Sequence, residues 1–331
     1  MKQTNNNFVE IPPSQFFVLQ KKAQYRSVCS LPGWEDCVIK SFSGIMFKHY
    51  LYNDEFLVTV SIINNKKING LPFTDIGAVL PIKGAVILDL ESFKQDCLNF
   101  FHQPFVLLVN SFVCPVIENN DTEDLVDFVL DLRSCKNSQD IIFGMRKTLK
   151  HIIKKDKKYA VSSSANLAEL KQLYRLYIKN LRQKKNLILP FEFFEFFYAQ
   201  KDAIFLCARN RDNQIIGFSL FLDTEKGVHY SLSAVDVLYR KEYVAHQILW
   251  HAIEQAVIKQ KEYVQLGGTR KDAPLSVFKK GWGAKPFPIY YVSSNSTSHE
   301  SMRESPFRIL YGKLPLWVIP YVSRILWKKV L

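Results

Sequence analysis

LGGTRKDAPLSVFKKGWGAKPFPIYY, residues 266–291, is the most informative stretch of this 331-residue chain. It continues a strand-like run, and its adjacent glycines, Gly267 and Gly268, are predicted to end that strand. Because glycine has no side chain, a ligand can approach the backbone closely at this point. Phe278 and Trp282 lie four residues apart on one face of a predicted helical turn, and we expect them to anchor that turn against a sheet.

The same stretch contains five cations, and four of them precede Trp282. Arg270 and Lys271 follow the strand, on an exit loop where cations can hold a phosphate or a carboxylate. Lys279 and Lys280 stand between the two aromatic anchors and are expected to point away from the face that the anchors bury. The alternative interpretation is a plain strand–turn–helix connection with solvated lysines.

The surrounding second half of the chain predicts a mixed module of helices and strands. Asn166 and Glu169 form a capping-box-like pair ahead of an amphipathic helix. Tight turns at 211–214 and 224–227 have the composition of hairpin turns. The expected elements are helices over 167–181 and 190–200, strands over 203–210, 215–223 and 228–236, a helix over 241–261, and strands over 263–269 and 288–292.

The first half of the chain follows a similar plan. Asp89 is predicted to cap one helix and Ser138 to cap a long basic helix. The expected elements are strands over 54–64, 105–112 and 125–132, helices over 90–101 and 139–158, and a loop over 71–81. We expect a boundary near Lys155, which gives domains over 1–155 and 156–300 and a tail over 301–331.

Composition limits the classes of protein and of partner. An apolar share of 47% indicates a folded globular chain. Lys and Arg outnumber Asp and Glu by 44 to 31, a net charge of +13, which favours anionic partners. The charge alone does not choose among nucleic acid, lipid headgroups and phosphorylated substrates. Stacked-aromatic RNA motifs and a helix-turn-helix pattern are missing from the sequence, so specific DNA binding is not expected.

Cysteine and histidine patterns indicate neither disulfides nor a metal site. The six cysteines are scattered without C-x-x-C spacing, and the seven histidines form no recognised ligand set. We expect reduced, buried thiols and no tightly bound cofactor. The N-terminus lacks the apolar region of a signal peptide, and the chain lacks an apolar run long enough to span a bilayer. A cytoplasmic location, with peripheral contact to the inner membrane face, is the expectation.

Four stretches, taken in order, resemble the FemAB family, whose members are built from two GNAT-type acyltransferase domains. They are LPFTDIGAVLP (71–81), FGMRKTLKHIIKK (143–155), LAELKQLYRLYIKNLRQKKNLILPFEFFEFFY (167–198) and residues 266–291. The likeness is closest to a subgroup associated with envelope polysaccharide systems, in which a tryptophan stands where Trp282 stands here. It implies an α/β (mixed α+β) fold of two tandem GNAT-like domains, each with a mixed, mostly antiparallel central sheet flanked by helices.

The resemblance also implies a site, because the lysine after the phenylalanine marks the substrate or donor cleft in the family. Lys279 is expected to act as an electrostatic clamp, since a lysine of pKa about 10.4 is a poor base. The predicted catalytic residues are Lys279, Tyr230 and Asp236, and the predicted substrate- or donor-binding residues are Arg270, Lys280, Gly267, Gly268, Trp282, Ser231, Ser233, Arg240, Phe73 and Asp75.

Several of these residues have a structural alternative. Asp236 also suits a cap for the turn that follows it, and Asp75 suits a turn in its own loop. Tyr230 and Ser231 alternate along their strand, so only one of them is expected to line a given face.

The turn that receives the donor's pyrophosphate in CoA-dependent GNAT proteins reads Gln/Arg-x-x-Gly-x-Gly/Ala. The corresponding stretch here is RKEYVA, residues 240–245, with Tyr243 in place of the first glycine. A tyrosine side chain is expected to obstruct a pyrophosphate cradle, and some family members take aminoacyl-tRNA instead. Acyl-CoA and aminoacyl-tRNA therefore both stay open as donors.

The C-terminal segment, residues 308–331, is basic and amphipathic. After Pro320, Val322, Ile325, Leu326 and Val330 are predicted to share one face, opposite Arg324 and Lys328. Such a segment suits the headgroup region of an anionic membrane, and similar tails end the polysaccharide-associated subgroup. The alternative is that it docks on its own domain.

These observations lead to one main hypothesis and one alternative. The main hypothesis is an acyltransferase that moves an acyl or aminoacyl group to an amine of an envelope polysaccharide or peptidoglycan-type precursor at the cytoplasmic membrane face. Direct attack by the amine is expected, because the sequence shows no activated Cys or Ser arrangement. The alternative is a non-catalytic GNAT-like scaffold at the membrane.

Overall fold

The computed structural model describes residues 7–23, 25, 31–70, 73, 77–82, 86–117, 124–154, 158–164, 166–294 and 311–330. The strands are β1 (Phe8–Ile11), β2 (Ile45–Tyr52), β3 (Phe56–Ile63), β4 (Lys67–Asn69), β5 (Val79–Pro81), β6 (Leu88–Asp89), β7 (Phe105–Asn110), β8 (Val116–Ile117), β9 (Leu125–Asp131), β10 (Ala160–Ser163), β11 (Ala203–Arg209), β12 (Ile215–Asp223), β13 (Gly227–Val235), β14 (Tyr263–Arg270) and β15 (Lys285–Ser293). The helices are α1 (Pro13–Gln20), α2 (Trp34–Ser41), α3 (Leu90–Phe100), α4 (Ser138–Gly144), α5 (Lys147–Lys154), α6 (Leu167–Gln183), α7 (Phe191–Ala199), the 3-10 helix η2 (Val237–Glu242), α8 (Val244–Ile258), α9 (Pro274–Gly281) and α11 (Ile319–Val330).

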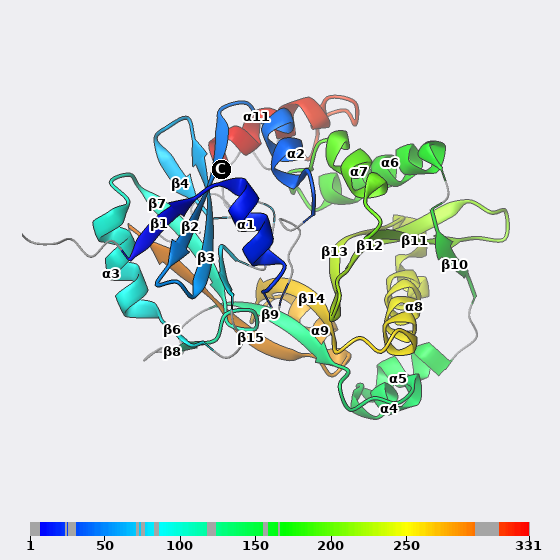
Figure 1. Cartoon of the computed structure of the whole chain (residues 1–331). Helices are drawn as coiled ribbons and strands as arrows, with labels where there is room; N and C mark the ends of the chain where they lie inside the picture. The colour runs from blue at the N-terminus through cyan, green and yellow to red at the C-terminus, as the bar shows by residue number, and fades with distance from the viewer. Residues whose placement is uncertain are drawn as a thin grey trace, which may run out of the picture.

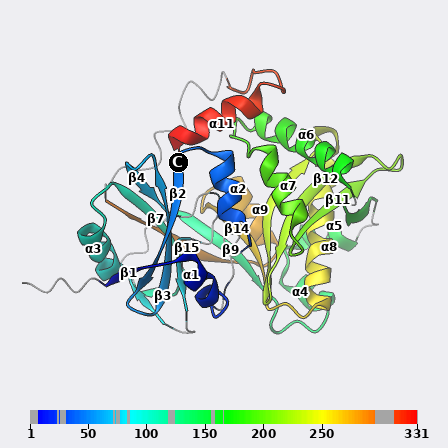
Figure 2. The ribbon, with the colours of Figure 1, turned by 45° about the horizontal axis from the view of Figure 1, so that its top comes forward.

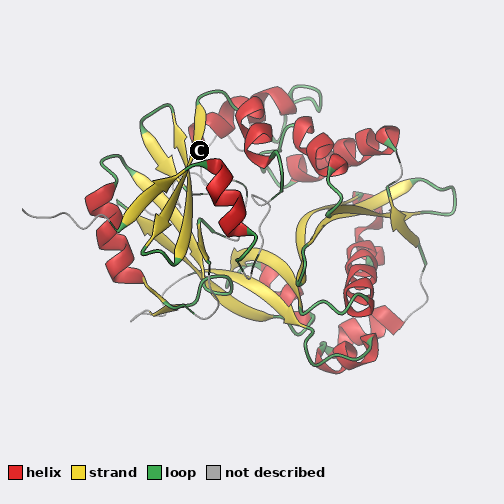
Figure 3. Ribbon diagram, viewed as in Figure 1, coloured by secondary structure: helices red, strands yellow, loops and turns green. Residues whose placement is uncertain are grey.

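One mixed sheet runs through the described part of the chain (Figures 1 and 3). Its order is β1-β2-β3-β4-β7-β15-β9-β14-β13-β12-β11-β10, and β5 adds to β3. Each half contributes antiparallel strands and one parallel pair joined through a helix, β4 with β7 through α3 and β13 with β14 through α8. The two halves thus repeat one α/β plan, as the sequence predicted.

The halves exchange strands at the centre of this sheet. β9, from the first half of the chain, pairs with β14 of the second half along most of its length. β15 pairs through residues 285–288 with β9 and through residues 289–293 with β7. Each half therefore completes its sheet with a strand of the other.

The strand exchange, rather than the order along the chain, determines which helices and strands pack together. α4 and α5 lie against α8, and Ile141 and Leu149 share a core with Trp250. Tyr290 of β15 lies instead in the core of the N-terminal half. The boundary near residue 155 stays a prediction for the order along the chain, but in space β9, α4 and α5 belong with the C-terminal half.

Most local predictions from sequence are confirmed. Asp89 accepts hydrogen bonds from the amides of Glu91 and Ser92 and so caps α3. Asn166 caps α6 by accepting from the Glu169 amide. The apolar residues expected to face inward from the long helix are all buried: Val244, Ile248, Leu249, Ala252 and Ala256.

The prediction for the basic helix was wrong in two respects. Asn137, not Ser138, is the N-cap, and it forms a capping box with Asp140. The expected single helix is broken into α4 and α5, because Met145 adopts an extended conformation.

The break between α4 and α5 is where the Gly-Trp-Gly segment docks. The Arg146 amide donates to the Gly281 carbonyl at 2.9 Å. Gly283 has φ +82°, and a Cβ built there would lie 3.1 Å from the Gly144 carbonyl oxygen. Glycine is required at Gly283 because both the positive φ and the close backbone approach exclude a side chain.

Replacement of Gly283 tests this docking. Gly283→Ala is expected to lower the free energy of unfolding by about 1–3 kcal/mol, since it adds left-handed strain and a steric conflict. Gly144→Ala is the matched control, because a Cβ there meets nothing within 4 Å, and alanine favours a helix end at least as well as glycine. Chemical denaturation measures the free energy of unfolding of both variants. Equal stability of the two variants would contradict the account.

Candidate functional site

β13 and β14 separate partway along their length. Their parallel ladder runs from Gly227↔Tyr263 to His229↔Gln265, yet β13 continues to Val235 and β14 to Arg270. Within β13, residues 230–233 are half-buried while both ends of the strand are buried. Beyond His229 and Gln265, therefore, the facing edges of β13 and β14 are not paired with each other.

Lys279 is buried at this parting of the strands. Its ammonium Nζ donates to the carbonyls of Gly267 at 2.7 Å and Gly268 at 3.3 Å, and the residue is 2% exposed. The β14–β9 register shifts between Gln265 and Gly268, so both carbonyls belong to an irregular part of β14. Lys279 therefore fastens α9 to β14. Its further role as a clamp on a ligand stays a prediction.

The neighbouring cations differ from Lys279 in their surroundings. Lys280 is exposed. The Arg270 guanidinium lies 3.3 Å from a carboxylate oxygen of Asp272 and 3.9 Å from one of Asp124. A ligand at Arg270 has to compete with these carboxylates.

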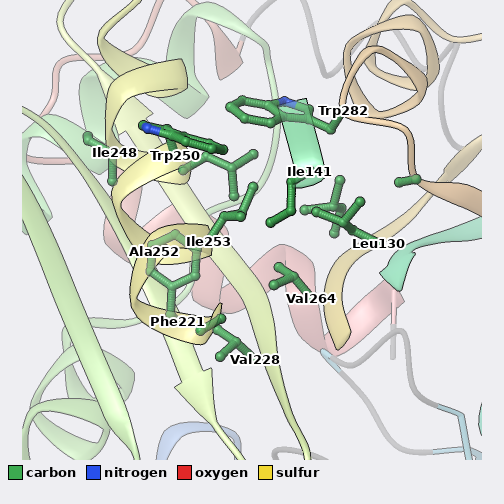
Figure 4. Packing of buried hydrophobic residues seen from close by; sticks show 14 of the residues in the cluster. Leu130, Ile141, Phe221, Val228, Ile248, Trp250, Ala252, Ile253, Val264 and Trp282 are labelled. Carbon is green, nitrogen blue, oxygen red and sulfur yellow. The ribbon is translucent and has the colours of Figure 1, made fainter. Parts of the chain in front are cut away.

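Trp282 is a core residue, and its predicted role in ligand binding stays a prediction. It is 0% exposed, and its indole lies nearly parallel to that of Trp250, with ring centroids 6.5 Å apart (Figure 4). The anchoring role that the spacing of Phe278 and Trp282 predicted is the one observed, because both side chains pack in the α8–α9 core.

A β-bulge sets the polar side chains of β13. Leu220 pairs with Leu232 and Phe221 with Tyr230, so Ser231 is the extra residue. The bulge brings Tyr230 and Ser233 to one face, where Ser233 and Ser219 hydrogen-bond the phenol and each other. Burial raises the pKa of Tyr230 more than these hydroxyls lower it. The phenol is therefore a proton donor at neutral pH rather than a base.

Asp236 is used as a cap, the alternative that the sequence left open. Its carboxylate accepts from the Leu238 amide at 3.0 Å and so begins η2. Arg240, in the same short helix, is exposed and donates to the Gln183 amide oxygen at 2.7 Å.

Phe73 belongs to an aromatic cluster. Its ring packs against Phe42, Phe193 and Trp327, which joins the N-terminal half, α7 and the tail. Phe73 is half-buried in this contact, and its predicted ligand-binding role stays a prediction. Asp75 lies outside the described residues.

Tyr243 begins α8 in a conformation that glycine would favour. It has φ 59° and ψ 27°, so the backbone keeps the left-handed geometry although the residue is tyrosine. Its ring lies edge-on to His246 at 5.4 Å. The first amides of α8 and the positive end of the helix dipole are next to this ring.

A basic hollow lies beside the start of α8. It has a volume of about 1040 Å³ and is lined by Lys147, Thr148, His151, Ile152, Lys158, Arg211, Lys241, Glu242, Tyr243 and Gln247. Glu242 is engaged by Lys158 and Tyr159. Lys147, Arg211 and Lys241 form no ion pair with any described carboxylate. The sequence did not predict this hollow, because its cations come from α5, the β11–β12 turn and η2.

A row of buried polar residues crosses the sheet next to the parted strands, and sequence reasoning missed it. Asp127 of β9 accepts from Asn110 of β7 at 2.8 Å and from Gln265 of β14. Gln265 is the register partner of His229, the last paired residue of β13. The available signal was an acidic residue inside an apolar strand, because a buried carboxylate requires such partners.

In the part of the chain that the structure describes, no cluster of three or more His, Cys, Asp or Glu side chains is arranged to hold a metal ion. Among the described helices, none has the length and apolar character needed to cross a membrane.

No protein-family model matches the sequence, and no curated protein does. Solved structures do share the fold over most of both chains. They include FemX, with 10% identity, a TM-score of 0.57 and coverage of 86% of this chain and 97% of that one. L-PGS from Bacillus licheniformis has 13% identity and a TM-score of 0.53, and the match covers 92% of this chain and 97% of that one. A conserved protein of unknown function from Bacteroides thetaiotaomicron has 12% identity and a TM-score of 0.53, and the match covers 86% of this chain and 98% of that one.

These structural matches concern the fold, since all three identities are low. The chain shares the mixed α/β fold of FemX and of L-PGS. The polysaccharide-associated subgroup stays a prediction.

Lys279 and Lys280 form a matched pair for mutation. Lys279→Met is expected to lower the free energy of unfolding by about 1–3 kcal/mol, because it removes the ammonium donor from the buried Gly267 carbonyl. Lys280→Met, at the adjacent exposed position, is expected to change it by less than about 0.5 kcal/mol. Urea unfolding of both variants checks this. A stable Lys279→Met protein would show that the ammonium does not fasten α9.

His246 gives the protein a pH-dependent stability. Burial, with a smaller contribution from Arg146, lowers its pKa from 6.5 to about 4. Between these values the unfolded chain binds a proton that the folded chain does not, so the free energy of unfolding falls as the pH decreases from 6.5 to 4, by about 3 kcal/mol.

His246→Phe keeps an aromatic ring beside Phe278, whose ring centroid is 4.9 Å away, and removes the titration. Unfolding free energies measured across this pH range are therefore expected to decline less in the variant. Parallel profiles for the two proteins would refute the assignment.

Proposed function

We propose that the protein is a GNAT-fold acyltransferase that moves an acyl or aminoacyl group from an anionic donor to an amine. The observation that carries the proposal is the parting of β13 from β14 beyond His229↔Gln265, next to the start of α8 and its basic hollow. The fold shared with FemX and L-PGS is consistent with this activity, although a fold alone does not determine a function.

The unpaired strand edges suit the reacting carbonyl. The acceptor amine attacks the donor's carbonyl carbon, and the oxygen becomes an oxyanion that backbone amides of the free β13 edge can stabilise. A C–N bond forms, the donor's C–S or C–O bond breaks, and the proton of the amine ends on the leaving thiol or hydroxyl. Tyr230 suits the role of acid at this last step, because burial keeps its phenol protonated.

The basic hollow suits the phosphates of the donor. Lys147, Arg211 and Lys241 line it without a described acidic partner, beside the amino end of α8. Both acyl-CoA and aminoacyl-tRNA carry phosphates that such a surface would bind. The left-handed backbone at Tyr243 is compatible with the glycine-type turn of CoA-dependent proteins.

The acceptor in this proposal is an amine of an envelope polysaccharide or peptidoglycan-type precursor, reached at the cytoplasmic membrane face. The motif resemblance supports this choice. The basic C-terminal segment, residues 308–331, supplies the predicted peripheral contact.

The competing function is a non-catalytic scaffold. The observation in its favour is that Tyr243 occupies the glycine position of the donor turn, where its ring lines the hollow. A scaffold would keep the fold without donor affinity.

A donor screen separates the two functions. Thermal unfolding is measured with acetyl-CoA, longer acyl-CoAs and aminoacyl-tRNA, and a donor at a hundred times its Kd is expected to stabilise the protein by about 2.7 kcal/mol. Lys147→Gln/Arg211→Gln/Lys241→Gln is expected to lose that stabilisation. The matched control is Lys66→Gln/Lys94→Gln/Lys136→Gln, which neutralises three exposed cations outside the hollow.

Stabilisation by one donor class, followed by transfer of its labelled acyl group to an added amine, would support the enzyme. Absence of stabilisation by every donor would favour the scaffold. An equal loss of donor stabilisation in the hollow variant and in the control variant would show that the basic hollow does not bind the donor.

A further inference from the structure

The C-terminal segment is docked in a fixed rotation. Ser323 is 1% exposed, and its hydroxyl lies 2.6 Å from the Tyr311 hydroxyl and accepts from the Ile188 amide at 3.3 Å. The Trp327 indole donates to the Ile188 carbonyl at 2.8 Å. Docking on its own protein, the alternative left open by the sequence, is therefore observed, and these contacts determine which residues of α11 face outward.

The outward residues differ from those that the sequence predicted. Val322 and Leu326 face the core, as expected, but Ile325 does not. Trp317 is 75% exposed, Tyr321 70% and Ile325 61%. Tyr321 and Ile325 lie four residues apart in α11, and Trp317 lies in the turn that precedes this helix. We call these three exposed side chains the apolar stripe.

The neighbouring helix α6 presents a row of cations. Lys171, Arg175 and Lys179 are exposed at intervals of four residues, and no described carboxylate pairs with any of them. By contrast, Arg209 and Arg324 at the edges of this region pair with Glu169 and Glu192. We call the three unpaired cations the cationic row.

The stripe and the row come from two segments that contact each other. α11 contacts α6, and the Arg182 side chain donates to the Gly312 carbonyl at 3.1 Å. Leu170 of α6 and Ile319 of α11 are buried in the same core beneath them. Figures 1 and 2 show the two helices near each other at the top of the molecule.

We propose that this surface binds the headgroup region of an anionic phospholipid bilayer, with α6 and α11 lying on the membrane. Tryptophan and tyrosine favour the membrane interface, the apolar stripe can enter it, and the cationic row is attracted to anionic headgroups. The exposed aliphatic Ile325 favours lipid over nucleic acid, because it offers no ring on which a base can stack. This inference does not depend on acyl transfer and extends the predicted contact from the tail to α6.

Flotation with vesicles of phosphatidylcholine, with and without phosphatidylglycerol, tests the proposal. The full chain is expected to bind the anionic vesicles and to lose binding as salt increases. Lys171→Gln/Arg175→Gln/Lys179→Gln is expected to reduce partitioning about a hundredfold and to remove most of the salt dependence. Trp317→Ser/Tyr321→Ser/Ile325→Ser is expected to bind more weakly but to keep the salt dependence.

The control Lys66→Gln/Lys94→Gln/Lys136→Gln carries the same change in charge elsewhere and is expected to bind as the parent does. Loss of binding in this control to the same extent, or parent-like binding by both test variants, would overturn the proposal. Loss of tRNA binding with unchanged vesicle binding in the row variant would assign the surface to nucleic acid instead. Stabilisation by acyl-CoA is expected to be unchanged in both test variants, so the two proposals fail separately.

Discussion

Two strands, β9 and β15, are shared by both halves of the protein, and the rest of the architecture depends on this exchange. β15 changes partner in mid-strand, from β9 over residues 285–288 to β7 over residues 289–293. Neither half has a complete sheet without the other, so the two cannot move as independent bodies. The backbone contact of Gly283 with Gly144 holds the start of β15 in place, because it fixes the loop that precedes that strand.

The candidate site follows from the same constraint. β9 occupies one edge of β14, which leaves the opposite edge to β13, and that ladder ends at His229↔Gln265. α9 is fastened over the irregular part of β14 by Lys279 and packs on α8 through Phe278 and His246. The strand opening, the buried ammonium and the start of α8 are therefore parts of one rigid arrangement rather than features of separate loops.

Local structure was predictable from sequence, whereas neighbours in space were not. The caps at Asp89 and Asn166 and the buried face of α8 follow from patterns within a few residues, and the motif order gave the fold. The strand exchange pairs residues far apart in sequence, which no local pattern encodes. For the same reason the sequence did not reveal that Trp282 is fully buried beside Trp250, or that the half-buried Phe73 packs against Phe193. The rotation of the tail depends on Ser323 and Trp327 meeting Ile188, a contact that the apolar periodicity of α11 does not contain.

The exchange also has a consequence for synthesis on the ribosome. β9 leaves the exit tunnel roughly 130 residues before β14 does, which at typical bacterial or eukaryotic elongation rates is a delay on the order of ten seconds. During that interval the nascent N-terminal half has a strand, with Asp127 in its centre, whose main-chain partners do not yet exist. An exposed strand edge of this kind invites pairing with another nascent chain. The buried carboxylate, which is poorly tolerated in an apolar intermolecular sheet, would discourage such mispairing until Gln265 arrives.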